Sequence, residues 1–287
     1  MLAIFKREFK GYFTNVTGPL FTAILLCFAG IFATAVNLYG QSAMFEYTLS
    51  NVSIVLLLII PILAMRSFSE EKHSRTDQLL YSLPLKPSTI VLAKYFAMLA
   101  IFLISIIVMV LYPFLLSAFG IVNYASCLAA LLGFFMLGAA LLAISMFISS
   151  LTESQVIAAV ISFGVIFVMY MMGIVTALIP QTALASYIGL AIVVVLIGLV
   201  FYYFTRNFVI SASVVGVGLI PLSIFYYFSR ASFEGLLPKI MSQLAVFERF
   251  DRFIYGIFDL SAIVYYISII VFFVFLTVQS LEKRRWS

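Results

Sequence analysis

The sequence predicts an all-α polytopic membrane protein with about eight transmembrane helices and both termini in the cytoplasm. Of its 287 residues, 65% are hydrophobic and only 9% are charged, whereas about a quarter of the residues in a soluble domain are charged. Such a chain has too little polar surface to cover itself in water. It also contains eight apolar segments long enough for a span of roughly 20 residues. These segments cover residues 20–40, 48–66, 89–118, 125–150, 155–179, 185–205, 208–228 and 260–281.

The apolar segments are predicted to be helices, because every backbone amide in lipid must find its partner within the protein. A transmembrane β-barrel shows segments of about 10 residues that alternate between apolar and polar. The runs 54–60 and 101–111 do not alternate. The first segment exceeds the roughly 7–15 apolar residues of a signal peptide, so we expect it to be retained as a helix.

The distribution of Lys and Arg predicts the orientation. With an even number of spans, both termini lie on one side, which also holds the basic residues of 66–94 and Arg206. The basic residues of the opposite side are Arg230, Lys239, Arg249 and Arg252. Cytoplasmic loops are rich in Lys and Arg, so the termini are expected in the cytoplasm. The net charge of +5 is explained by this topology, and no nucleic-acid partner is expected.

The N-terminal stretch 1–18 is predicted to be an amphipathic helix in the cytoplasmic interface. Leu2, Phe5 and Phe9 recur at helical spacing, and Lys6 and Lys10 occupy much of the remaining surface. This is the pattern of a helix that lies on the membrane with its apolar face in lipid. Simple anchoring to lipid accounts for it.

The cytoplasmic stretch 67–88 is predicted to hold a short charged helix. Ser67 or Ser69 can cap its start, and Pro84 can stop it. Charges give such an element specificity for a soluble partner and apolar residues give it anchor area, although an ordinary solvated loop is the alternative. The docking candidates are Glu70, Glu71, Arg75, Asp77, Leu79, Leu80 and Leu83.

A second cytoplasmic turn, 149–155, joins two apolar segments by a tight hairpin. It carries one charge, Glu153, and Thr152 can cap the helix that follows. Capping is one reading of this turn and contact with a partner is the other.

The outer stretch 229–259 is predicted to be an amphipathic, interfacial segment. Apolar residues from Phe233 to Ile257 form one helical stripe, and Pro238 should bend the helix near its start. This segment can serve as a lid on the outer side of a pathway through the membrane.

Residues that carry chemistry are sparse. His73 is the single histidine, and no Asp, Glu, Lys or Arg lies near the middle of a predicted span, which disfavours a proton- or ion-coupled carrier. The sequence has no Gly-rich phosphate-binding loop, no catalytic triad and no metal-ligand cluster. Cys27 and Cys127 are expected to be free, buried thiols. No enzymatic activity, cofactor or metal is therefore expected in this chain.

Three stretches resemble the ABC-2 type permeases, and more narrowly their gliding-motility and copper-enzyme-maturation branch. The first runs from PILAMRSFSEE at 61–71 through TDQLLYSLP at 76–84 to IVLAKY at 90–95, and it is similar to the region of the first coupling helix. The second is the turn 149–155. The third comprises FIYGIFDL at 253–260, VYY at 264–266 and LEKRRW at 281–286.

The resemblance implies a six-helix core with an extra hairpin, about 185–228, in a single domain 1–287. It also implies an exporter in a bacterial plasma membrane, in which two permease subunits pair as a homo- or heterodimer above two cytoplasmic ABC ATPases. Those ATPases would bind ATP and Mg²⁺. They would dock on 70–83 and on a secondary contact that includes Thr152 and Glu153. An extracytoplasmic accessory protein is a further expected partner. The alternative functions are a secondary carrier, a membrane enzyme and a membrane scaffold.

Overall fold

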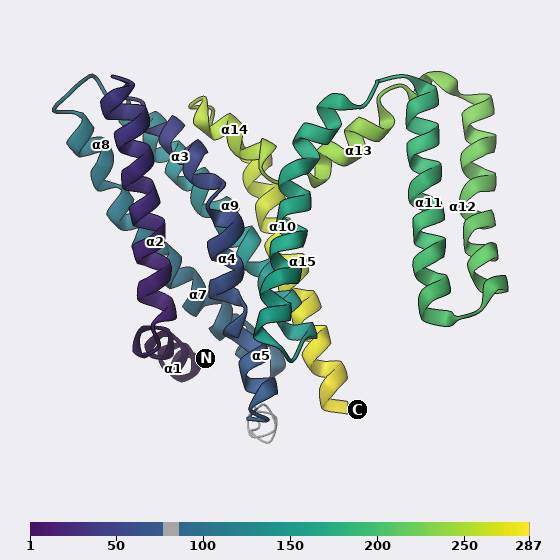
Figure 1. Cartoon of the computed structure of the whole chain (residues 1–287), viewed down its shortest axis with the longest axis horizontal. Helices are drawn as coiled ribbons and strands as arrows, with labels where there is room; N and C mark the ends of the chain where they lie inside the picture. Colours follow the sequence, from purple (N-terminus) through teal and green to yellow (C-terminus); the bar gives the residue numbers. More distant parts are fainter. Residues whose placement is uncertain (77–85, 287) are drawn as a thin grey trace. The chain divides into compact units, whose positions relative to one another are not determined.

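The computed structural model describes residues 1–76 and 86–286, and within them it is helical without β-strands (Figure 1). Contacts divide the chain into two compact units, Met1–Val168 with Arg249–Ser287, and Met169–Glu248. The first unit contains, in whole or in part, α1 (Leu2–Thr14), α2 (Thr17–Phe32), the π-helix η1 (Ala33–Tyr39), α3 (Phe45–Ser53), α4 (Leu56–Ala64), α5 (Arg66–His73), α7 (Pro87–Met109), α8 (Leu111–Leu116), α9 (Tyr124–Leu151), α10 (Gln155–Leu178), α14 (Glu248–Ile254) and α15 (Leu260–Trp286).

Helix α9 forms the centre of the first unit, where it packs against α3, α4, α5, α7 and α15. Small residues allow this close approach. The ring of Phe253 lies over Gly133, and the ring of Phe102 lies over Gly138, where an added Cβ would be 2.2 Å from a ring carbon. Helices in lipid gain their contact through such small residues, because apolar burial between helices contributes little there.

The second apolar segment forms a broken span. Helices α3 and α4 are bent by 58° at the break between Ser53 and Leu56. Pro61 lies inside α4. The buried hydroxyl of Thr48 in α3 donates a hydrogen bond to the side chain of Asn37 in η1, which fixes the outer end of the bend.

Six described helices are long and apolar enough to cross a membrane, and the bent α3–α4 pair is a seventh candidate. The remaining expected segment, 185–205, corresponds to a shorter apolar helix among the described residues, Ala183–Leu199. The all-α polytopic fold is confirmed, and seven of the expected segments pass as candidate spans within the described residues when the bent pair is counted as one. Figure 1 shows the N- and C-termini at the same end of the first unit as α5, as expected for termini on one side of a membrane.

The second unit begins within α10 and contains α11 (Ala183–Thr205), α12 (Phe208–Phe228), the 3₁₀ helix η2 (Arg230–Phe233) and α13 (Leu236–Leu244). Helices α11 and α12 form the predicted hairpin. Its turn is made by Arg206 in the left-handed conformation and by Asn207, whose side chain caps α12.

Three predictions about the outer segment and the thiols are wrong. The stretch 229–259 is not one helical stripe, because α13 ends at Leu244 and α14 starts at Glu248. Pro238 does not bend a helix, since it lies in the first turn of α13, where its missing N–H removes no bond. Cys127 is buried, as expected, but Cys27 is exposed on the surface of α2. The expectation of a single domain stays a prediction.

Candidate functional site

Helix α5 is the described part of the predicted docking segment. It does not start at a serine cap: the hydroxyls of Ser67 and Ser69 donate to the carbonyls of Ala64 and Met65 in the preceding turn. Residues Leu56–His73 therefore form one helix that carries the membrane-embedded α4 directly into α5.

The C-terminus of α5 is closed by a left-handed residue. Arg75 has φ of 56°, its N–H donates to the carbonyl of Lys72 at 3.2 Å, and the N–H of Thr76 donates to the carbonyl of Glu71 at 3.0 Å. These two bonds form a Schellman motif, which usually has glycine at the position of Arg75. The motif leaves the Arg75 side chain exposed at the tip of the helix.

A serine hydroxyl joins α5 to the end of α9. Ser149 Oγ accepts hydrogen bonds from the N–H groups of Phe68 and Ser69, at 3.2 and 3.3 Å, and donates to the carbonyl of Met65 at 2.9 Å. The buried ammonium of Lys72 donates to the carbonyl of Ser150. The first predicted docking element is therefore fixed beside the turn that contains the second one.

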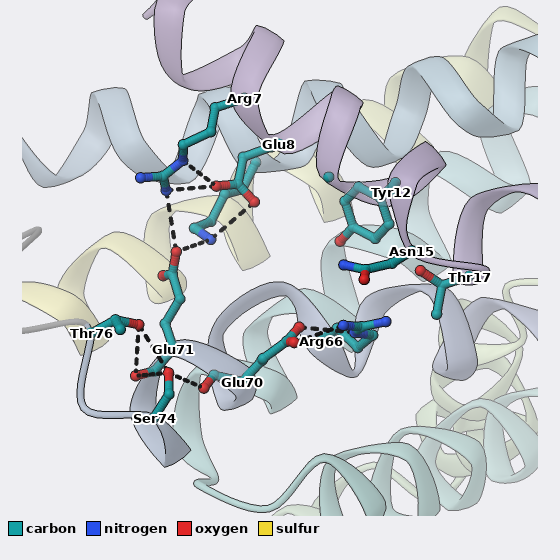
Figure 2. Close-up of a pocket in the computed structure, with 12 residues that line it drawn as sticks. Arg7, Glu8, Tyr12, Asn15, Thr17, Arg66, Glu70, Glu71, Ser74 and Thr76 are labelled. Carbon is teal, nitrogen blue, oxygen red and sulfur yellow. Dashed lines mark hydrogen bonds and ion pairs between the residues drawn. The ribbon is translucent and has the colours of Figure 1, made fainter.

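An ion-pair network connects α5 to α1 and α7 (Figure 2). Lys94 Nζ of α7 lies 3.3 Å from Glu8 Oε2 of α1 and 2.9 Å from Glu71 Oε1 of α5, and it donates to the carbonyl of Ser67 at 2.8 Å. Arg7 Nη2 bridges the same two carboxylates, at 2.7 Å from Glu8 and 3.3 Å from Glu71. A buried ammonium needs such pairing to stay charged, so Lys94 holds three helices together.

Two groups of α1 have pKa values shifted by this network. Burial raises the pKa of Glu8, but the charge of Lys94 and the hydrogen bond and charge of Arg7 oppose it, and the net pKa lies below its usual value. The hydrogen bond to Glu8 raises the pKa of Arg7. Both groups are thus charged near neutral pH, and the network is stable there.

A cavity of about 560 Å³ opens between α1, α5 and α7 beside this network. It is lined mainly by polar and charged side chains. Figure 2 shows Arg66 and Glu70 on one side of this region and Tyr12, Asn15 and Thr17 on the other. Arg66 Nε and Nη2 donate to the carboxylate of Glu70 at 2.8 and 2.6 Å.

The second cytoplasmic turn exposes Leu151 and Glu153. The prediction that Thr152 caps α10 is wrong, because its buried Oγ1 has no hydrogen-bond partner among the described residues. Ser154 supplies the cap instead, accepting from the N–H of Ile157 at 3.5 Å.

The structure separates the predicted docking residues into groups. Glu71 is turned inward to Lys94 and Arg7, whereas Glu70 keeps 43% of its side chain exposed and pairs with Arg66. Arg75 and Glu153 are exposed. The remaining predicted residues lie outside the described residues; they are Asp77, Leu79, Leu80 and Leu83.

Sequence reasoning missed the residues that assemble the site. Glu8 is the one acidic residue in a basic helix, and Lys94 is a lone charge in an apolar helix. Both patterns indicate a buried partner, although neither identifies it. Among residues 1–76 and 86–286, no group of three or more His, Cys, Asp or Glu is arranged to hold a metal ion.

Residues 16–211 match the family described as ABC-2 family transporter protein. The chain belongs to the ABC-2 family. Neither curated proteins nor solved structures give a match. The matched range contains α5, the turn that follows α9 and the whole of α11.

As an ABC-2 protein, the chain is the multi-pass membrane permease component of an ABC transporter, which works with an ATPase subunit. The exposed end of α5 and the adjacent turn are the described features of the first unit that suit such contact. We call Glu70, His73, Arg75, Leu151 and Glu153 the coupling surface.

Proposed function

We propose that this permease exports its substrate across a bacterial plasma membrane and takes its energy from separate cytoplasmic ATPases that dock on the coupling surface. The ATPases bind ATP and Mg²⁺, and the permease binds no cofactor. A second permease subunit, identical or homologous, completes the pathway. An accessory protein outside the membrane, near the 185–228 hairpin or the 229–259 segment, is a further proposed partner.

The triple contact of Ser149 supports this proposal more than any other observation. It ties the backbone of α5 to the end of α9, the most buried of the candidate spans. A force applied to α5 is thereby shared with the central helix and, through α4, with the broken span. Coupling between subunits requires an element with two arrangements that the partner can bias, and the bent α3–α4 pair is positioned to be that element.

The exposed charges at the tip of α5 supply specificity. Arg75 is held outward by the Schellman motif and Glu153 lies in the neighbouring turn, while the exposed side chain of Leu151 offers apolar contact area. Charged rims around an apolar anchor steer a partner and reject wrong ones. Asp77, Leu79, Leu80 and Leu83 extend the proposed docking segment, Thr152 belongs to the proposed secondary contact, and Glu71 holds the base of α5 through Lys94 and Arg7.

Co-purification tests the docking surface. The permease and its ATPase are expressed together, and Arg75→Glu and Glu153→Lys are compared with Lys239→Glu, a charge reversal in α13. We expect each coupling-surface variant to reduce co-purified ATPase several-fold, and the Arg75→Glu/Glu153→Lys double variant to abolish it. Undiminished recovery of the ATPase with the double variant would overturn the proposed site.

A further inference from the structure

The cavity between α1, α5 and α7 contains polar groups that the described part of the chain leaves without partners. Tyr12 is only 7% exposed, and its hydroxyl makes no hydrogen bond to a described residue. In Figure 2 this hydroxyl points toward Asn15, on the side facing Arg66. Thr17 Oγ1 is also buried and unpartnered within the described residues. Leaving such groups unpaired costs free energy, so a ligand that satisfies them would bind favourably.

The same part of the cavity favours an anion. Thr17 is the first residue of α2 and lines the cavity, and no side chain caps this helix, so the positive end of the helix dipole lies beside the cavity. Arg66 uses Nε and Nη2 on Glu70, which leaves Nη1 without a bond to the described residues. Two hydroxyls, a helix N-terminus and a guanidinium together match the acceptor oxygens of a phosphate.

Carboxylates on the α5 side of the cavity favour a cationic group close to the proposed phosphate. Glu70 remains 43% exposed although it pairs with Arg66, and the hydroxyls of Ser74 and Thr76 line the same cavity. The lining has equal numbers of positive and negative residues, so the cavity suits a zwitterionic ligand better than a ligand with a net charge. They are Arg7, Arg66 and Lys94 against Glu8, Glu70 and Glu71.

The position of the cavity indicates the source of such a ligand. Thr17 begins one candidate span, and Lys94 lies in the second turn of another, Pro87–Leu116. Lipid headgroups occupy the depth at which spans enter the membrane. The volume of about 560 Å³ is in the usual range for a small-molecule site.

We propose that this cavity binds the headgroup of an amino-phospholipid, with its phosphate at Tyr12, Thr17 and Arg66 and its ammonium at Glu70. The site joins α1 to α5, so a bound lipid stabilises the position of the helix that carries the coupling surface. This inference does not depend on ATPase docking.

Lipid binding by the purified full chain tests the site. Delipidated protein in detergent is titrated with phosphatidylethanolamine, and bound lipid is counted by native mass spectrometry while thermal unfolding is followed in parallel. Tyr12→Phe and Thr17→Val remove hydroxyls that bond no described residue, so the lipid-free melting temperatures should not fall. Each variant should bind the lipid about tenfold more weakly, because a hydrogen bond to a charged group is lost. Tyr39→Phe, an exposed tyrosine in η1, is the matched control and should bind like the wild type.

Two further binding measurements, with a soluble headgroup and with a different lipid, identify the ligand. Soluble glycerophosphoethanolamine at the same concentration should not compete with phosphatidylethanolamine. If it bound equally well, the ligand would be a free phosphate ester and not a lipid, which would overturn the proposal. Phosphatidylglycerol, which lacks the ammonium, should bind more weakly than phosphatidylethanolamine, and Glu70→Gln should remove this preference. Unchanged phosphatidylethanolamine affinity in the Tyr12→Phe/Thr17→Val double variant would overturn the site itself.

Discussion

The ammonium of Lys94 lies 2.9 Å from the carboxylate of Glu71, and thereby fixes α5 to the membrane-embedded helix α7. Lys94 is 2% exposed and reaches Glu8 of α1 from the same position. One buried cation thus links the N-terminal helix, a membrane span and the proposed docking element.

Removing this cation should destabilise the unit strongly. Lys94→Met keeps most of the side-chain volume but removes the ammonium that lies between the carboxylates of Glu8 and Glu71. Loss of one partner from a buried ion pair costs about 3 kcal/mol or more. We expect a clear fall in the melting temperature of the purified protein. Lys10→Met, at an exposed position of α1, should change it little. Equal stability of the two variants would show that Lys94 does not hold α1, α5 and α7 together.

The contribution of Glu8 should depend on pH in one direction. Its pKa is lowered in the folded protein, where Lys94 and Arg7 face it. The stabilisation is therefore fully present above its ordinary value of 4.5 and is lost as the pH falls through the lower folded value.

Melting curves of the wild type and Glu8→Gln at a series of pH values measure this effect. The difference in melting temperature should be constant from pH 7 down to about 5, and it should shrink at more acidic pH. A difference that grows on acidification would mean that Glu8 is not held as a paired carboxylate.

Ser149→Ala should weaken the attachment of α5 to α9. The change removes the acceptor of two backbone N–H groups and one of the two hydroxyls that donate to the carbonyl of Met65, at a cost of about 1–3 kcal/mol. We also expect substrate-dependent ATP hydrolysis by the assembled transporter to fall, because α5 would no longer move with α9. Ser268→Ala is the control, since this exposed hydroxyl bonds only to its own helix. Normal coupling in Ser149→Ala would exclude this route of transmission.

Gly138→Ala should disrupt the packing of α9 on α7. The added methyl group would lie 2.2 Å from the Phe102 ring, and overpacking of this kind costs about 1–3 kcal/mol. Gly164→Ala in α10 meets no atom within 4 Å and should be neutral or stabilising, since alanine favours helix. Thermal unfolding distinguishes the two, and a neutral Gly138→Ala would show that α7 moves aside freely.

Hydrophobic patterning predicted the helical fold, the N-terminal helix and the α11–α12 hairpin, because the length and polarity of each segment determine these features locally. It misplaced the start of α5, since Ser67 and Ser69 bond backward to Ala64 and Met65 instead of capping a new helix. Local sequence does not distinguish these two uses of a serine.

The site itself was predictable only in outline. The sequence places charges in 67–88 and in the turn at 149–155, but the partners of Glu71 come from α1 and α7, far away in sequence. Such pairing depends on how the helices pack, and no local pattern encodes it. The inward orientation of Glu71 and the place of Tyr12 in the cavity lining therefore became visible only in the structure.

Site-specific cross-linking in intact cells tests whether an ABC ATPase docks at the tip of α5. A photoreactive side chain replaces Arg75 in one variant and Lys239, in the outer segment, in another. We expect the probe at position 75 to cross-link to an ABC ATPase and the probe at position 239 not to do so. Labelling of position 75 by a membrane-impermeant reagent added outside the cell, with no ATPase cross-link, would contradict this expectation.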